Sequence, residues 1–109
     1  MQITLSPVRG LPGQAETTVA VSGDMITVDG FDYDLSAVPE GGEAIPRGTD
    51  HPFIGRITRE DGAIRCTLRV TLGDDAAPHQ PTDPAHWIVE AGDGPVTIPA
   101  TRKEADDAA

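Results

Sequence analysis

The sequence predicts a single small all-β domain, in which antiparallel hairpins and a meander form a sandwich or partly open barrel of about seven or eight short strands. Three observations predict this fold. Apolar and polar residues alternate in short runs, Asp-Gly or Gly-Asp pairs separate neighbouring runs, and no long run has the period of a helix. The 109 residues suit one domain with one modest core. We assign residues 1–99 to this domain and residues 100–109 to a flexible acidic C-terminal tail.

The first third of the chain predicts an opening strand and a three-stranded meander. Ile3 and Leu5 alternate with polar residues in the opening strand, whose pairing partner the sequence does not identify. Between residues 17 and 35, the candidate turns Gly23-Asp24 and Asp29-Gly30 give mutually consistent registers. Asp32 and Asp34 fall on the outer face of this meander. The predicted pairs on the inner face are Val21 with Ile26, Val19 with Val28, Val28 with Phe31, and Ile26 with Tyr33.

The strongest hairpin signal lies between Phe53 and Leu72, where Asp61-Gly62 separates two alternating runs. A two-residue loop at this pair fixes the register of the whole ribbon. On its inner face Ile57 faces Cys66, Gly55 faces Leu68, and Phe53 faces Val70. On its outer face the predicted neighbours are Arg56 with Thr67, Thr58 with Arg65, and Ile54 with Arg69.

Two irregular segments, residues 36–52 and 73–86, are rich in proline and are predicted to be long surface loops. A last hairpin is predicted to join residues 87–90 to residues 96–98. Pro95 and Pro99 favour an edge strand there, because proline cannot donate to a central ladder.

The inward-facing positions of these strands define the predicted core. Either Trp87 or Ile88 is expected to join it from the last hairpin. Its other members are Ile3, Leu5, Val19, Val21, Ile26, Val28, Phe31, Tyr33, Leu35, Phe53, Ile57, Ile64, Cys66, Leu68, Val70 and Leu72.

Composition limits the partners of the chain. The net charge of −10 argues against nucleic acid and against an acidic membrane surface, since both bind clusters of lysine and arginine. The single cysteine, Cys66, excludes an intrachain disulfide. We find no signal peptide and no membrane span, so we expect the chain to be made in the cytoplasm.

The residues with reactive side chains do not form a recognisable catalytic or metal motif. Cys66 falls on the inner face of a strand, where a small buried apolar role is favoured over a nucleophile. The spacing of His79 and His86 matches no known zinc motif. An alternative is that an ion is bound by His79, Asp83 and His86 together. The aspartates of the meander lack the order of a calcium loop. We therefore predict that the protein is not an enzyme and that it has no catalytic residues, no metal and no cofactor.

Charge segregation identifies a candidate protein interface. Four of the eight basic residues, Arg56, Arg59, Arg65 and Arg69, lie within fourteen positions. Arg56, Arg65 and Arg69 share the outer face of the ribbon and can bind carboxylates of a partner protein. The alternative is that they pair with the chain's own acids, such as Asp32 and Asp34. Trp87 is the fourth candidate, as an exposed contact or, alternatively, as part of the core.

Several segments occur in an order that resembles a known family. They are Ile3-Thr4-Leu5-Ser6-Pro7, Val21-Ser22-Gly23-Asp24 before Ile26-Thr27-Val28, Phe31-Asp32-Tyr33-Asp34-Leu35, Val38-Pro39-Glu40-Gly41 and Asp93-Gly94-Pro95-Val96. Together they resemble small uncharacterised proteins of proteobacterial phages and prophages, encoded near tail and tail-fibre genes. The quoted residues belong to turns and strands, so the resemblance carries no catalytic assignment.

The resemblance implies a non-enzymatic phage accessory or structural protein, tail-associated, that acts through protein–protein interaction. Its partner would be another phage structural or tail protein, and a homo-oligomer is left open. The host cytoplasm is then the expected location, with the virion as a second one. The alternative function is a small β module that binds a small ligand or saccharide in a loop pocket.

Overall fold

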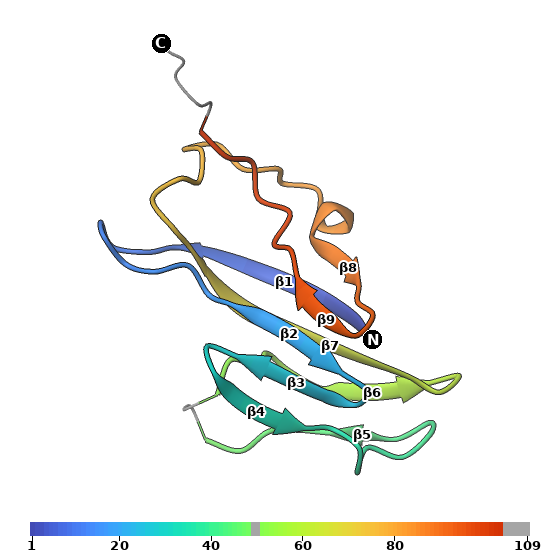
Figure 1. Cartoon of the computed structure of the whole chain (residues 1–109). Coiled ribbons are helices and arrows are strands. Elements are labelled where there is room, and N and C mark those ends of the chain that lie inside the picture. The colour runs from blue at the N-terminus through green and yellow to red at the C-terminus, as the bar shows by residue number, and fades with distance from the viewer. Residues whose placement is uncertain (49–50, 104–109) are drawn as a thin grey trace.

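The computed structural model describes residues 1–48 and 51–103. Over these residues the chain is nearly all β, with nine strands and one short 3-10 helix, so the predicted fold class is confirmed. Three of the strands, β5, β8 and β9, have only two or three residues. Two sheets pack against each other, as Figure 1 shows. The elements are β1 (Gln2–Arg9), β2 (Val19–Ser22), β3 (Met25–Val28), β4 (Phe31–Asp34), β5 (Glu43–Ala44), β6 (Ile57–Glu60), β7 (Ala63–Leu72), η1 (Pro84–Trp87), β8 (Ile88–Glu90) and β9 (Gly94–Val96).

The five-stranded sheet has the order β5-β6-β7-β1-β8, and the four-stranded sheet has the order β4-β3-β2-β9. Strand β1, whose partner the sequence did not identify, pairs in parallel with β7 and places Ile3 beside Cys66 and Leu5 beside Leu68. This pairing departs from a purely antiparallel fold. It is feasible because the meander and β6 together provide the long crossover that parallel neighbours require.

The predicted meander is confirmed. Strands β2, β3 and β4 pair in sequence, and all four predicted inner-face pairs occur in the predicted register. Asp29 and Gly30 both have positive φ, of 52° and 84°, as a type I′ turn requires. The turn chemistry was therefore sufficient to fix the register of this part of the sheet.

The central hairpin is confirmed near its turn and wrong farther from it. Thr58 pairs with Arg65 and Glu60 with Ala63, as the Asp61-Gly62 loop predicts. Farther along, Phe53 pairs with Leu68 and not with Val70. The N–H of Ile54 donates to the Thr67 carbonyl at 2.9 Å, so Ile54 does not lie beside Arg69. The cause is a bulge at Gly55, which has a φ of +70°. The bulge adds two residues on this side of the ribbon, and because two is an even number, Phe53 stays on the inner face.

The predicted last hairpin is wrong. Strand β8 pairs with β1 in the five-stranded sheet, whereas β9 pairs with β2 in the four-stranded sheet. The short connection between them, residues 91–93, crosses from one sheet to the other, and the Asp93 carboxylate accepts from the Gly23 N–H at 2.8 Å. Pro95 does lie in an edge strand, as predicted.

Most of the predicted core is buried between the sheets. Phe31 is the main exception, because it follows directly on the turn at the margin of the four-stranded sheet and is 69% exposed. Tyr33 is half-buried, Trp87 is buried, and Ile88 is exposed. The core also includes Val38, Ala76 and Ile98, which were not predicted.

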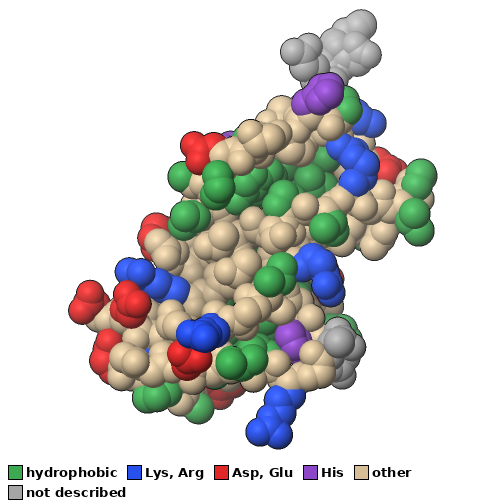
Figure 2. Space-filling view, turned by 180° about the vertical axis from the view of Figure 1, so that it is seen from behind, with side chains coloured by type: hydrophobic (Ala, Val, Ile, Leu, Met, Phe, Trp, Pro, Cys, Tyr) green, Lys and Arg blue, Asp and Glu red, His purple; other side chains and the backbone are tan. Residues whose placement is uncertain are grey.

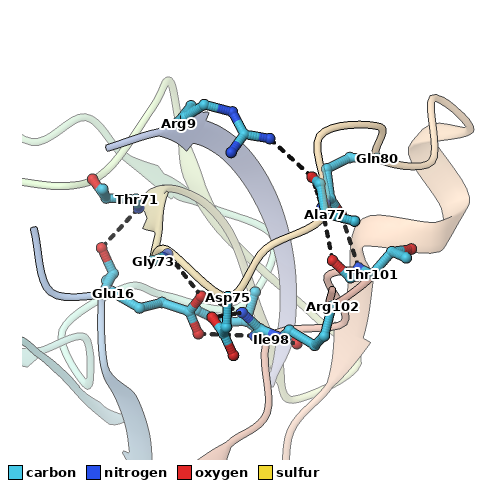
Figure 3. A network of polar contacts seen from close by, with 11 residues as sticks. Arg9, Glu16, Thr71, Gly73, Asp75, Ala77, Gln80, Ile98, Thr101 and Arg102 are labelled. Carbon is cyan, nitrogen blue, oxygen red and sulfur yellow. Dashed lines mark hydrogen bonds and ion pairs between the residues drawn. The ribbon is translucent and has the colours of Figure 1, made fainter. Parts of the chain in front are cut away.

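The first residues of the predicted flexible tail are held in place. Arg102 forms a bidentate ion pair with Glu16 at 2.5 and 2.9 Å and also contacts Asp75 at 3.1 Å (Figure 3). Arg102 also lies in a β-bridge with Ala76. Residues 104–109 of that tail lie outside the described residues.

Candidate functional site

The four residues of the predicted interface do not form one surface. Trp87 is 4% exposed, and its indole N–H donates to the Pro81 carbonyl at 2.9 Å, so it is a core residue. Arg56 pairs with Glu43 at 3.3 Å, and Arg65 pairs with Glu60 at 3.2 Å.

The arginines of the ribbon are therefore largely paired within the chain, although with other acids than Asp32 and Asp34. Arg59, the fourth, pairs with Asp24 at 2.9 Å and donates to the Val38 carbonyl at 2.7 Å. Figure 2 shows acidic and basic side chains intermixed on this view of the surface, without one continuous basic patch. The exposed pairs of Arg56 and Arg65 contribute little, about 0–1 kcal/mol each.

Arg69 lies in a different environment, an open hollow of about 260 Å³ that we call the Phe31 cleft. It forms where the backbone neighbour of β7 changes from the segment around Pro52 to the segment around Thr17. The Pro52 carbonyl accepts from the Arg69 N–H at 2.8 Å, and two residues farther on the Thr71 carbonyl accepts from the Thr17 N–H at 3.0 Å. The opening between these two segments is lined by Thr17, Val28, Asp29, Phe31, Tyr33, His51, Pro52, Arg69 and Thr71.

The Phe31 cleft combines aromatic, cationic and acidic side chains. Phe31 stands exposed at the cleft, while the Tyr33 ring packs edge-on against Phe53, with ring centroids 5.2 Å apart. Arg69 and Asp29 add charges of opposite sign to the lining. Aromatic rings and arginine are the side chains that most often dominate protein interfaces.

A second hollow, which we call the β4 slot, is lined by residues of β4 and of the segment that follows β5. Its volume is about 480 Å³. Tyr33 and His51 line both hollows, so the two hollows are neighbours. The slot is lined by Asp32, Tyr33, Asp34, Leu35, Pro46, Arg47, His51, Phe53 and Ile57.

Asp34 contributes a fixed negative charge to the β4 slot. Hydrogen bonds from the Ser36 side chain and backbone N–H hold the pKa of the Asp34 carboxyl below its ordinary value. Asp32 accepts a hydrogen bond from the Thr27 hydroxyl at 2.6 Å. Both carboxylates are exposed, as the sequence predicted for the outer face of the meander.

His51, which lines both hollows, carries a buried polar atom without a partner among the described residues. Its Nδ1 accepts from the Phe53 N–H at 3.1 Å, so the proton of the neutral ring lies on Nε2. Nε2 is buried and has no hydrogen-bond partner among residues 1–48 and 51–103.

The reactive side chains Cys66 and His86 are both held in contacts within the chain. Cys66 is buried, and desolvation raises the pKa of its thiol to about 12, which disfavours the reactive thiolate. The His86 ring packs edge-on against Trp87 and lies within hydrogen-bond distance of the Pro99 carbonyl. Within the described part of the chain, no three His, Cys, Asp or Glu side chains group closely enough to hold a metal ion.

Sequence reasoning missed Phe31 and His51 as site residues. Parity predicts a core position for Phe31, and the only signal for its exposure is its position directly after a turn. His51 was placed in an irregular loop, and no local pattern indicated that the loop lies beside β4.

Comparison with known protein families, with curated proteins and with solved structures finds no match to this chain. Among the described residues, no helix is long and apolar enough to cross a membrane.

Proposed function

We propose that this chain is a non-enzymatic binding module that docks onto another protein through the Phe31 cleft. Following the sequence resemblance, we propose a phage structural or tail protein as the partner. The observation that supports docking is Phe31 itself, a large apolar ring left exposed beside Tyr33 and Arg69.

The energetic reason is hydrophobic. Fully burying a phenylalanine side chain is worth about 1.5–3 kcal/mol, and most of the Phe31 ring is still in water. A partner that covers the ring recovers that free energy, and Arg69 and Asp29 at the same cleft supply orientation through charge. Small-molecule sites usually enclose most of the ligand, and this hollow is open. An open hollow with an aromatic residue at its edge is better suited to contact with a protein surface.

The test is partner capture with matched variants. Tagged protein is recovered from prophage-induced cells, and the retained proteins are identified by mass spectrometry. We expect the wild-type chain to retain a phage structural or tail protein, and Phe31→Ser to lose it. Leu11→Ser is the control, because Leu11 is 76% exposed in a loop outside both hollows. Equal retention by Phe31→Ser and the wild-type chain would refute docking through this cleft.

A second candidate function is binding of a small ligand or saccharide. It is favoured by the convergence of Asp29, His51 and Arg69 on the Phe31 cleft, since such polar groups fix the orientation of small ligands. A sugar or anion present at 100 times its dissociation constant would stabilise the fold by about 2.7 kcal/mol. Thermal unfolding across a panel of sugars and anions measures this, and an unchanged melting temperature throughout the panel would count against it.

A further inference from the structure

We infer that β4 is the docking edge for an extended segment of the partner protein, which lies in the β4 slot and adds a strand to the four-stranded sheet. The inference rests on the proposed function and names how the partner is held. Three features of the described residues support it: the outer edge of β4, which no described strand covers, the hollow beside that edge, and the charges that flank it.

Among residues 1–48 and 51–103, β4 is an edge strand, with no strand paired on the side away from β3. In a hairpin with a two-residue loop, the residues that flank the loop exchange both backbone hydrogen bonds, and every second pair after them does so too. Val28 and Phe31 flank the Asp29-Gly30 loop, and the Leu35 N–H donates to the Asp24 carbonyl at 2.9 Å in the same alternation. The N–H and C=O groups of Asp32 and Asp34 therefore point away from β3.

The other edge strands offer less than β4. Strand β9, the opposite edge of the four-stranded sheet, carries Pro95 opposite Ala20, and proline has no N–H to donate. At the edges of the five-stranded sheet, β5 has two residues and β8 has three. Within the described part of the chain, β4 is the longest edge strand, and a hollow lies along it. Strand addition to such an edge is a common way to bind an extended peptide.

The chemistry of the segment follows from the two faces of β4. Residues directly opposite each other across two strands lie on the same face of the sheet. The segment residues opposite Asp32 and Asp34 would lie beside two exposed carboxylates, which favours lysine or arginine there. The residue between them would lie opposite Tyr33 and point toward the buried side chains that line the slot, Leu35, Phe53 and Ile57. The segment therefore alternates basic and apolar residues.

Charge also decides against a second copy of this chain at the same edge. Two β4 strands paired through their outward N–H groups would place aspartates directly opposite aspartates, and like charges in that position are destabilising. The net charge of −10 adds a general repulsion between copies. Arg47 is the one arginine at the slot, but it is exposed on the facing loop, where solvent screens its charge.

The experiment uses the full chain and a fluorescent nine-residue peptide in which lysine alternates with valine. The matched control peptide has the same composition with its lysines consecutive. We expect fluorescence anisotropy to show tighter binding of the alternating peptide. On binding, amide hydrogen exchange should slow at Asp32 and Asp34, whereas Phe31 and Tyr33, already bonded to β3, should change less. Equal affinity for both peptides, or unchanged exchange at the two aspartates, would overturn strand addition.

Charge variants of the two aspartates test the register. The double change Asp32→Lys with Asp34→Lys should weaken binding of the lysine peptide at least tenfold, roughly what reversing two cross-strand pairs predicts. The same variant should bind a peptide that alternates glutamate with valine. The neutral double change Asp32→Asn with Asp34→Asn serves if the lysine variant does not fold, because it keeps the hydrogen-bond acceptors toward Thr27 and Ser36. Its affinity for the lysine peptide should lie between those expected for the wild-type chain and the lysine variant.

The two proposals fail separately. If a partner depends on Phe31 but the alternating peptide shows neither preference nor protection, strand addition is wrong and docking at the cleft stands. If no captured partner depends on Phe31, the proposed function is wrong, whatever the peptide does.

Discussion

At the scale of single residues, Glu16 and Arg102 connect the segment before β2 to the last described residues of the chain. Hydrogen bonds from Arg102 hold the pKa of Glu16 below its ordinary value, against the opposing effect of partial burial. The Gly73 N–H donates to the same carboxylate at 3.1 Å (Figure 3). Because the pKa is lowered in the folded state, the ionised carboxylate stabilises the fold at pH values above its unfolded pKa, about 4.3.

We predict that Glu16→Gln lowers the free energy of unfolding at pH 7 by about 1–2 kcal/mol, since it removes a partly buried charged pair. The difference from the wild-type chain should shrink as the pH falls below about 4.3, through the lowered pKa of Glu16. Urea unfolding at several pH values measures it. Glu43→Gln is the control, because its pair with Arg56 is exposed and should contribute less than about 0.5 kcal/mol. Equal losses in the two variants would contradict the role given to Glu16.

At the scale of elements, the bulge at Gly55 decides what the central hairpin presents. It moves the Pro52 and Phe53 segment two residues along β7 and brings His51 beside both hollows. Gly55 has a φ of +70°, and a Cβ added there would meet no atom within 4 Å. The cost of a side chain at this position is therefore one of backbone conformation.

We predict that Gly55→Ala destabilises the fold by about 1–2 kcal/mol, the cost of left-handed backbone for an alanine. Gly92→Ala is the control, because Gly92 also has open space around it but does not have positive φ. Its effect should stay within about 0.5 kcal/mol. Urea denaturation compares the two variants. A loss at Gly92 as large as the loss at Gly55 would contradict the conformational explanation.

At the same scale, sequence reasoning succeeded where a turn fixes the register and failed where the chain had to choose a distant partner. Asp29-Gly30 predicted all its pairs correctly, and Asp61-Gly62 predicted those next to its turn, because turn geometry and side-chain parity act locally. The pairs beyond Gly55 were wrong, because the bulge there shifts the register. No local pattern predicts that β1 lies parallel to β7, or that β8 and β9 join different sheets.

At the scale of the whole molecule, the packing of the two sheets decides which side chains are exposed. Alternation predicted that Phe31 points to the inner face, but inner-face parity buries a side chain only where the other sheet covers it. The outer-face arginines were predicted correctly as exposed ribbon residues, while their pairing with Glu43 and Glu60 depends on tertiary contacts. Only Arg69, among the four predicted interface residues, lies at a candidate site.

The claim that β4 and the Phe31 cleft form the binding face is tested most directly by cross-saturation NMR of the deuterated, labelled chain with its captured, protonated partner. The expected result is saturation transfer concentrated at Phe31, Tyr33 and His51 and along β4. Transfer concentrated instead around Arg56 and Arg65, on the outer face of the ribbon, would contradict the claim and return the interface to that face.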